Sequence, residues 1–104
     1  MRFESVTLSK NIKEIEEMLF SNCLSLEQIT IPRNVKTIKT NAFVDMYKIK
    51  KVVIKSKKLK TVKKQIFIGV EKNIKVILPK EKRIHYKKFF TKKRQGEQID
   101  FVYK

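Results

Sequence analysis

The sequence contains few side chains of the types and spacings that catalysis or metal binding requires. His85 is the only histidine and Cys23 the only cysteine, and no Ser/His/Asp or clustered Cys/His spacing accompanies either. Glu14, Glu16 and Glu17 fall within one turn, whereas a catalytic pair of carboxylates must face a substrate pocket from opposed positions. We therefore expect a solvated acidic face, no enzymatic activity, and no cofactor or metal.

Basic residues are the abundant group that could bind a ligand. The 104 residues include 26 Lys/Arg and 10 Asp/Glu, a formal net charge of +16. Residues 1–52 hold nine basic and six acidic residues, net +3, whereas residues 53–104 hold seventeen and four, net +13. Such a field attracts polyanions, including nucleic acid, anionic cell-wall polymer and sulfated glycan. We expect either a solvated lysine-rich surface or a polyanion patch, with these members: Lys80, Lys82, Arg83, Lys87, Lys88, Lys92, Lys93 and Arg94.

The elements that must position these side chains follow an apolar pattern that recurs along the chain at a nearly constant spacing. The apolar columns are Val6/Ile29/Val52, Leu8/Ile31/Ile54, Ile15/Ile38/Val62 and Phe20/Phe43/Phe67. The column Ile12/Val35/Leu59 and the column Ile15/Ile38/Val62 show the same one-residue slip, which places an insertion within residues 55–58. A period of about 20–29 residues with one short strand in each unit is typical of a leucine-rich-repeat-like solenoid.

The columns predict an α/β repeat solenoid over residues 1–78, with short parallel strands. Stacking buries apolar faces that one unit cannot bury alone, so neighbouring strands should lie side by side. The boundaries are three units, at 3–25, 26–48 and 49–72, and a fourth strand at 74–78.

Residues 79–104 are predicted to form the cap that the end of a solenoid needs. A helix over 80–94 should begin after Pro79 and end before Gly96, and alternating apolar residues predict a strand over 98–103. The opposite end has no comparable segment, which favours a longer array that continues upstream.

The chain resembles the BspA-like leucine-rich repeats of bacterial surface proteins over nearly its whole length. Three segments carry the resemblance: the repeat segment 26–43, the junction 20–26, and the closing segment 78–90. The family usually has Gly directly after the second apolar pair, where this chain has Glu16, Lys39 and Lys63. If the backbone there has positive φ, each of these residues is strained by about 1 kcal/mol.

The resemblance implies a non-enzymatic module for adhesion or protein binding at a cell surface. Ligands would contact strand positions between the apolar columns, which are Ser5, Thr7, Gln28, Thr30, Lys51 and Val53. The alternatives are polyanion or nucleic-acid binding through the basic C-terminal half, and a purely structural end cap of a longer array. No apolar run approaches the roughly 20 residues of a transmembrane helix. We expect a surface or secreted location if the chain is part of a longer protein, and a cytoplasmic one if Met1 is the true start.

Overall fold

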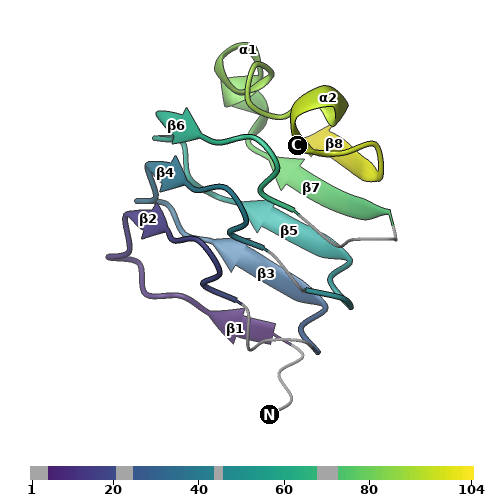
Figure 1. Ribbon diagram of the computed structural model, residues 1–104. Helices are drawn as coiled ribbons and strands as arrows, with labels where there is room; N and C mark the ends of the chain where they lie inside the picture. The colour runs from purple at the N-terminus through teal and green to yellow at the C-terminus, as the bar shows by residue number, and fades with distance from the viewer. Residues whose placement is uncertain (1–4, 21–24, 44–45, 68–72) are drawn as a thin grey trace.

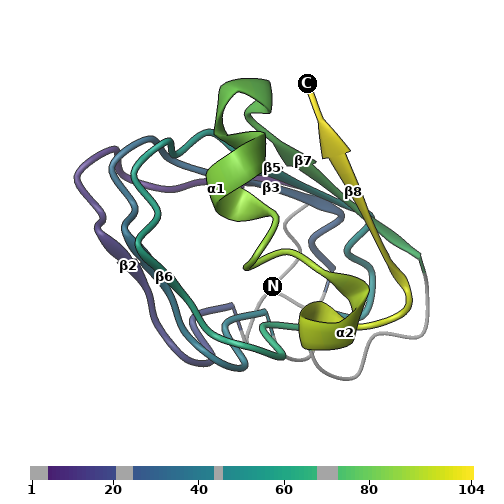
Figure 2. The same ribbon diagram turned by 90° about the horizontal axis from the view of Figure 1, so that it is seen from above.

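The structure is a computed structural model that describes residues 5–20, 25–43, 46–67 and 73–104, with only the backbone for residues 5–7 (Figure 1). The chain runs alternately through two parallel sheets, which lie on opposite sides of the molecule (Figures 1 and 2). The five-stranded sheet has the order β1 (Ser5–Thr7), β3 (Gln28–Ile31), β5 (Lys51–Ile54), β7 (Ile74–Leu78) and β8 (Ile99–Tyr103). The three-stranded sheet consists of β2 (Glu14–Ile15), β4 (Thr37–Ile38) and β6 (Thr61–Val62).

The strand register follows the sequence period. Val6 pairs with Ile29, Ile29 with Val52, and Val52 with Val76. Each partner occupies the same position in its own turn of the chain, so the predicted parallel pairing of the strands is confirmed. The final strand, β8, also lies parallel to β7, with Ile74 opposite Ile99.

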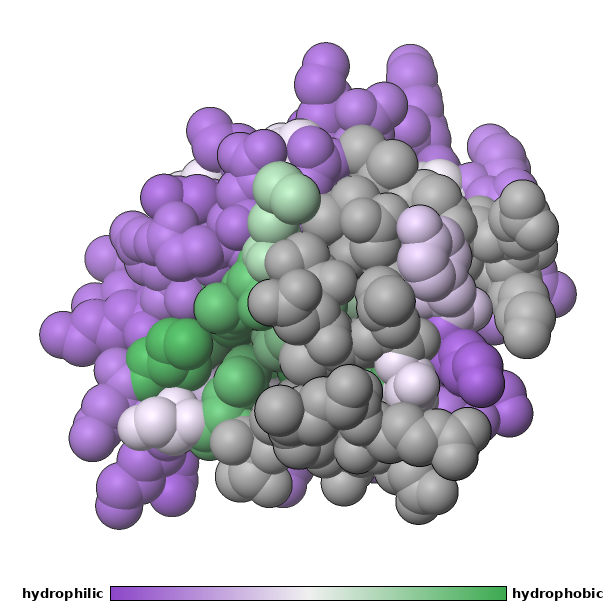
Figure 3. Space-filling view, turned by 60° about the horizontal axis from the view of Figure 1, so that its bottom comes forward, coloured by the Kyte–Doolittle hydropathy of each residue, from purple (hydrophilic) through white to green (hydrophobic). Residues whose placement is uncertain are grey.

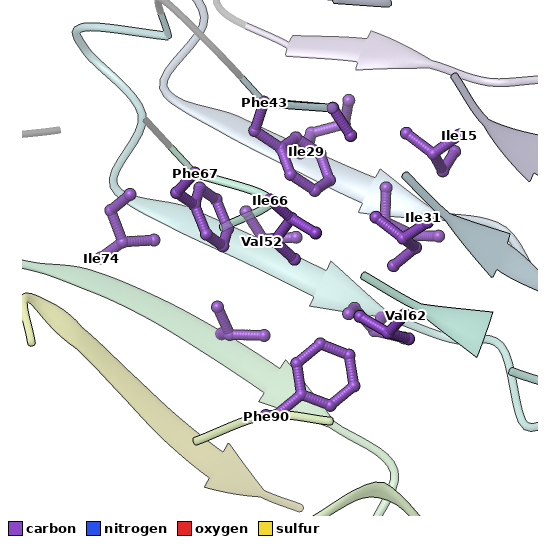
Figure 4. Close-up of a cluster of buried hydrophobic side chains, with 14 of the residues drawn as sticks. Ile15, Ile29, Ile31, Phe43, Val52, Val62, Ile66, Phe67, Ile74 and Phe90 are labelled. Atoms are coloured by element: carbon purple, nitrogen blue, oxygen red, sulfur yellow. The ribbon is translucent and has the colours of Figure 1, made fainter. Parts of the chain in front are cut away.

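The core fills the space between the two sheets (Figure 4). Ile29 and Val52 point inward from the five-stranded sheet, while Ile38 and Val62 do so from the three-stranded sheet, and all four are buried. Phe43 lies between two other rings: Phe20 at a centroid distance of 5.4 Å and Phe67 at 4.9 Å, both nearly parallel to it. Burying one such apolar side chain contributes roughly 1.5–3 kcal/mol. The predicted apolar columns therefore become ladders of like side chains along the stack.

The cap differs from the single helix that we expected over residues 80–94. The structure has a 3-10 helix, η1 (Lys80–Lys82), a short α1 (Arg83–Tyr86), and, after a turn, α2 (Lys92–Gln95). Thr91 interrupts the helix with extended backbone, and its hydroxyl accepts a hydrogen bond from the Arg94 amide at 3.1 Å.

The interruption has a geometric reason. From Tyr86 to Gln95 a continuous helix would make about two and a half turns, so it would direct these two side chains to opposite sides. In the structure both are buried and both bond the backbone of residues 56–66. The break lets both side chains bond the backbone of residues 56–66, over which α1 and α2 lie in Figure 2.

The residues with positive φ are not those that the sequence suggested. The left-handed backbone occurs at Met18, Asn41 and Gln65, with φ of 58°, 61° and 54°, two positions after those where the family usually has Gly. The prediction of backbone strain at Glu16, Lys39 and Lys63 is therefore wrong, because positive φ occurs two residues later in each case.

The left-handed residues form a hydrogen-bonded ladder along the stack. The Met18 amide donates to the Asn41 carbonyl at 3.0 Å, the Asn41 amide to the Gln65 carbonyl at 3.1 Å, and the Gln65 amide to the Arg94 carbonyl at 2.8 Å. These bonds explain why a costly conformation is kept at this point of every turn.

The end that carries β1 presents apolar surface. Figure 3 views the molecule from this side and shows hydrophobic side chains bordered by hydrophilic ones. Met18 is 51% exposed and Leu19 40% exposed, and Leu8 and Ile12 are only partly buried. At the other end, Tyr86 and Phe90 cover the core and are almost fully buried.

Candidate interaction surface

The predicted binding positions on β3 and β5 lie on the outer face of the five-stranded sheet. Gln28 is exposed, and Thr30, Lys51 and Val53 are partly buried, whereas the residues that alternate with them are buried. Ser5 and Thr7 pair in register with Gln28 and Thr30. The side chains of β1 lie outside the described part of the structure, so these two positions are placed by their backbone alone.

The same face extends across β7 and β8, which the sequence prediction missed. One row of side chains, with one residue from each strand, runs across the sheet from Gln28 and Lys51 to Lys75 and Asp100. The period offered a signal, because Lys75 occupies in the fourth strand the position that Lys51 occupies in the third.

A second row runs beside it along the same face. This row continues from Thr30 and Val53 to Ile77 and Val102, and all four side chains are partly buried. Ile77 likewise occupies the position of Val53, one period further along the chain. Val102 has no such signal, since β8 follows the cap helices and lies outside the repeat.

The predicted polyanion patch is divided among η1, α1, the turn and α2, and several of its members hold the cap together. The Arg94 guanidinium donates to the Val62 carbonyl at 2.8 Å. The Lys92 ammonium donates to the carbonyls of Glu97 and Ile99 at 3.0 and 2.9 Å, and it lies 3.3 Å from the Asp100 carboxylate.

Two further members of the patch cover aromatic rings. Arg83 lies 5.6 Å from the centre of the Tyr103 ring, and Lys88 lies 5.1 Å from that of Phe89. Among the described residues, the side chains of Lys80, Lys82, Lys87 and Lys93 form no ion pair and no hydrogen bond. These four are the members best placed to meet a ligand.

The other candidate residues form no chemical centre in the part of the chain that the structure describes. His85 is exposed on α1, and Cys23 lies outside the described residues. No group of three or more His, Cys, Asp or Glu suitable for a metal ion occurs among the described residues. The described helices also include none long and apolar enough to cross a membrane.

The acidic residues at β2 pair with Lys39, which directly follows β4. Lys39 lies 2.9 Å from the Glu16 carboxylate and 3.7 Å from that of Glu14. The hydrogen bond from Lys39 holds the pKa of Glu16 below its ordinary value of 4.5. These groups are solvent-exposed and linked across the stack, as expected for a solvated face.

Two buried polar side chains of the cap were not anticipated. The Tyr86 hydroxyl accepts from the Leu59 amide at 3.1 Å and donates to the Ser56 carbonyl at 2.8 Å. Burial raises the pKa of Tyr86, although both hydrogen bonds act in the opposite direction. These bonds satisfy backbone groups of residues 56–59 that would otherwise be buried without a partner.

Gln95 acts in the same way on the other side of the cap. Its amide oxygen accepts from the Ile66 amide at 3.0 Å, and its amide nitrogen donates to the carbonyls of Lys63 and Phe89, both at 2.9 Å. Tyr86 and Gln95 therefore pair buried backbone groups of residues 56–66 that face α1 and α2. No pattern in the sequence indicates this role, since apolar periodicity identifies only what fills the core.

A family model described as the BspA type leucine rich repeat region (6 copies) matches residues 1–102. No curated protein and no solved structure matches the chain. The matched residues include both sheets and nearly all of the cap.

Proposed function

This chain belongs to the BspA-type leucine-rich-repeat family, and we propose that it is a non-enzymatic protein-interaction module. We name the outer residues of the five-stranded sheet the strand-face surface. Its described members are Gln28, Thr30, Lys51, Val53, Lys75, Ile77, Asp100 and Val102. A protein ligand would bind across it by shape and polar complementarity, with no covalent step.

The observation that supports this proposal is the register of the strands. Each row holds one side chain from each of four consecutive strands, about 4.8 Å apart. The rows combine amide, ammonium, carboxylate and aliphatic groups. Rigid strands give such a surface a fixed shape, so binding orders few side chains and loses little conformational entropy.

Three parts of the proposal rest on the family and on the repeat spacing. We infer a solenoid of three units over residues 1–78, closed by a cap over 79–104. We also place the module at a cell surface, in an adhesive role, because the repeats that it resembles come from surface proteins. The cap has a structural task, in which it covers the apolar end of the stack.

A matched pair of variants tests the strand-face surface. Thr30 and Thr37 are both partly buried threonines, but Thr30 lies on β3 and Thr37 on β4 of the other sheet. Peptides selected by display against the wild-type protein should lose affinity for Thr30→Glu and bind Thr37→Glu almost normally. Circular dichroism checks that both variants fold. Selected peptides that bind both variants equally well would exclude the strand-face surface.

A further inference from the structure

A basic groove lies at the ends of the strands and overlaps the strand-face surface at Gln28 and Thr30. Its volume is about 780 Å³. The charged residues that line it follow successive strands of the five-stranded sheet: Lys10 comes after β1, Arg33 after β3, and Lys55, Lys57 and Lys58 after β5. These five residues define what we call the basic groove.

The basic residues of the groove recur with the repeat. Lys10, Arg33 and Lys57 occupy equivalent positions in three successive turns of the chain. A side-chain bridge links the same three turns: the Asn34 amide donates to the Lys10 carbonyl at 2.8 Å, and the Lys58 ammonium donates to the Asn34 side-chain oxygen at 3.1 Å. Three successive turns therefore place a cation at the same relative position.

The positive charge of the groove is largely unbalanced. Lys57 forms an ion pair with Glu81 at 2.7 Å. Elsewhere in the described chain, no carboxylate lies within ion-pair distance of Lys10, Arg33, Lys55 or Lys58. The groove thus presents four cations without an acidic partner among the described residues, which favours an anionic ligand.

The remaining lining decides which anion fits best. Leu8 and Pro32 contribute apolar surface, and Gln28 and Thr30 contribute hydrogen-bonding groups. No aromatic side chain is among the described lining residues, so these offer no platform on which a nucleic-acid base could stack. Apolar surface between cations suits a polypeptide that carries both carboxylates and aliphatic side chains.

We propose that the basic groove binds an acidic segment of a protein partner in extended conformation. Three strands span about 10 Å at the usual spacing of a sheet. About three residues of extended chain cover that distance. Its carboxylates pair with Lys10, Arg33 and Lys55, and an aliphatic side chain contacts Leu8 or Pro32. This assignment rests on the protein-interaction function proposed above and names the chemistry of the partner.

Fluorescence anisotropy with a labelled peptide Gly-Asp-Asp-Leu-Asp-Asp-Gly tests the assignment. The groove variant is Arg33→Glu/Lys55→Glu. The control is Lys63→Glu/Lys64→Glu, two exposed lysines that follow β6 of the other sheet and lie outside the groove lining, and it lowers the net charge equally. We expect the Kd to rise at least about tenfold in the groove variant, because two attractive contacts become repulsive. The control should change the Kd less than twofold. The Asn-for-Asp peptide should bind far more weakly to the wild-type protein.

Three outcomes would overturn the acidic-segment assignment. Equal weakening in both variants would show that net charge alone attracts the peptide. A short oligo-dT that binds more tightly than the peptide, and loses binding in the groove variant, would assign the groove to nucleic acid. Absence of peptide binding to the wild-type protein would also exclude the assignment. The proposed interaction function would survive that last result if display-selected peptides lost affinity for Val53→Glu, a strand-face substitution outside the groove lining.

Discussion

The substitution Tyr86→Phe tests how the cap closes the stack. Tyr86 is 1% exposed, and its hydroxyl bonds both the Leu59 amide and the Ser56 carbonyl. Phenylalanine keeps the ring and removes only the hydroxyl, which leaves these two backbone groups unpaired in a buried place. An unpaired buried polar group costs about 1–3 kcal/mol, so we expect a loss of about 2–4 kcal/mol in the free energy of unfolding.

A second tyrosine of the same region provides the control. The Tyr103 hydroxyl is buried and has no hydrogen-bond partner among the described residues. Tyr103→Phe therefore removes no hydrogen bond, and the free energy of unfolding should change by less than about 0.5 kcal/mol or rise. The comparison separates the hydrogen bonds of Tyr86 from any general effect of removing a phenol.

Urea unfolding of the three proteins measures these free energies. Amide hydrogen exchange adds a local readout, because the Leu59 amide should exchange faster in Tyr86→Phe than in either other protein. The free energy of unfolding at alkaline pH gives a third readout. The raised pKa of Tyr86 stabilises the fold below pH 10, and this contribution is lost as pH rises through the higher folded-state pKa. Equal losses for Tyr86→Phe and Tyr103→Phe, with unchanged exchange at Leu59, would refute the closing role.

Three further outcomes are expected. Gln65→Gly should relieve the strain of positive φ at that residue and raise the free energy of unfolding by up to about 1 kcal/mol, whereas Lys63→Gly should lower it by about 0.5–1 kcal/mol. Denaturant titration measures both values, and the opposite order would show that the strained residue is Lys63, where the family usually has Gly. Because Lys39 lowers the pKa of Glu16, the pair stabilises the fold above pH 4.5 and loses this contribution as pH falls through the lower folded-state pKa. The melting temperature of Lys39→Gln should therefore depend less on pH in the acid range than that of the wild-type protein. Joining a copy of residues 26–48 to the N-terminus should cover the apolar surface beside β1 and raise the melting temperature in calorimetry; equal melting temperatures for the extended and the original chain would count against an open end.

The sequence predicted the parts of the fold that depend on repetition. A shift by one repeat aligned Val6 with Ile29, and the structure pairs these two residues directly. The same shift aligned Phe20 with Phe43, whose rings stack with an angle of 5°. Strand pairing and core columns follow from one constraint: like side chains at a fixed period can be buried only by stacking.

The parts that were missed depend on single contacts. Met18, rather than Glu16, has positive φ because its amide must reach the Asn41 carbonyl, and no periodicity of side chains reports a backbone hydrogen bond. Ser56 lies in the segment that holds the insertion of the third turn, yet it is fully buried and bonds the Val35 carbonyl. A serine between lysines offers no sign of burial in the sequence.

The candidate site likewise has one part that could be predicted from the sequence and one part that could not. Alternation within β3 and β5 located Gln28, Thr30, Lys51 and Val53 on the outer face. The basic groove was missed, because its residues come from three turns and the repeat was aligned on its apolar columns alone. Only the stacking of those turns brings Lys10 and Lys55 into one lining.

The most direct test of the proposed interaction surface is an NMR titration of the isotope-labelled protein with a display-selected peptide. Amide shift changes should concentrate on β3, β5 and β7, around Thr30, Val53 and Ile77, and should leave Thr37 and Thr61 of the three-stranded sheet unchanged. Changes centred on β4 and β6, or on the cap residues Lys87 and Lys93, would contradict the assignment of binding to the strand-face surface.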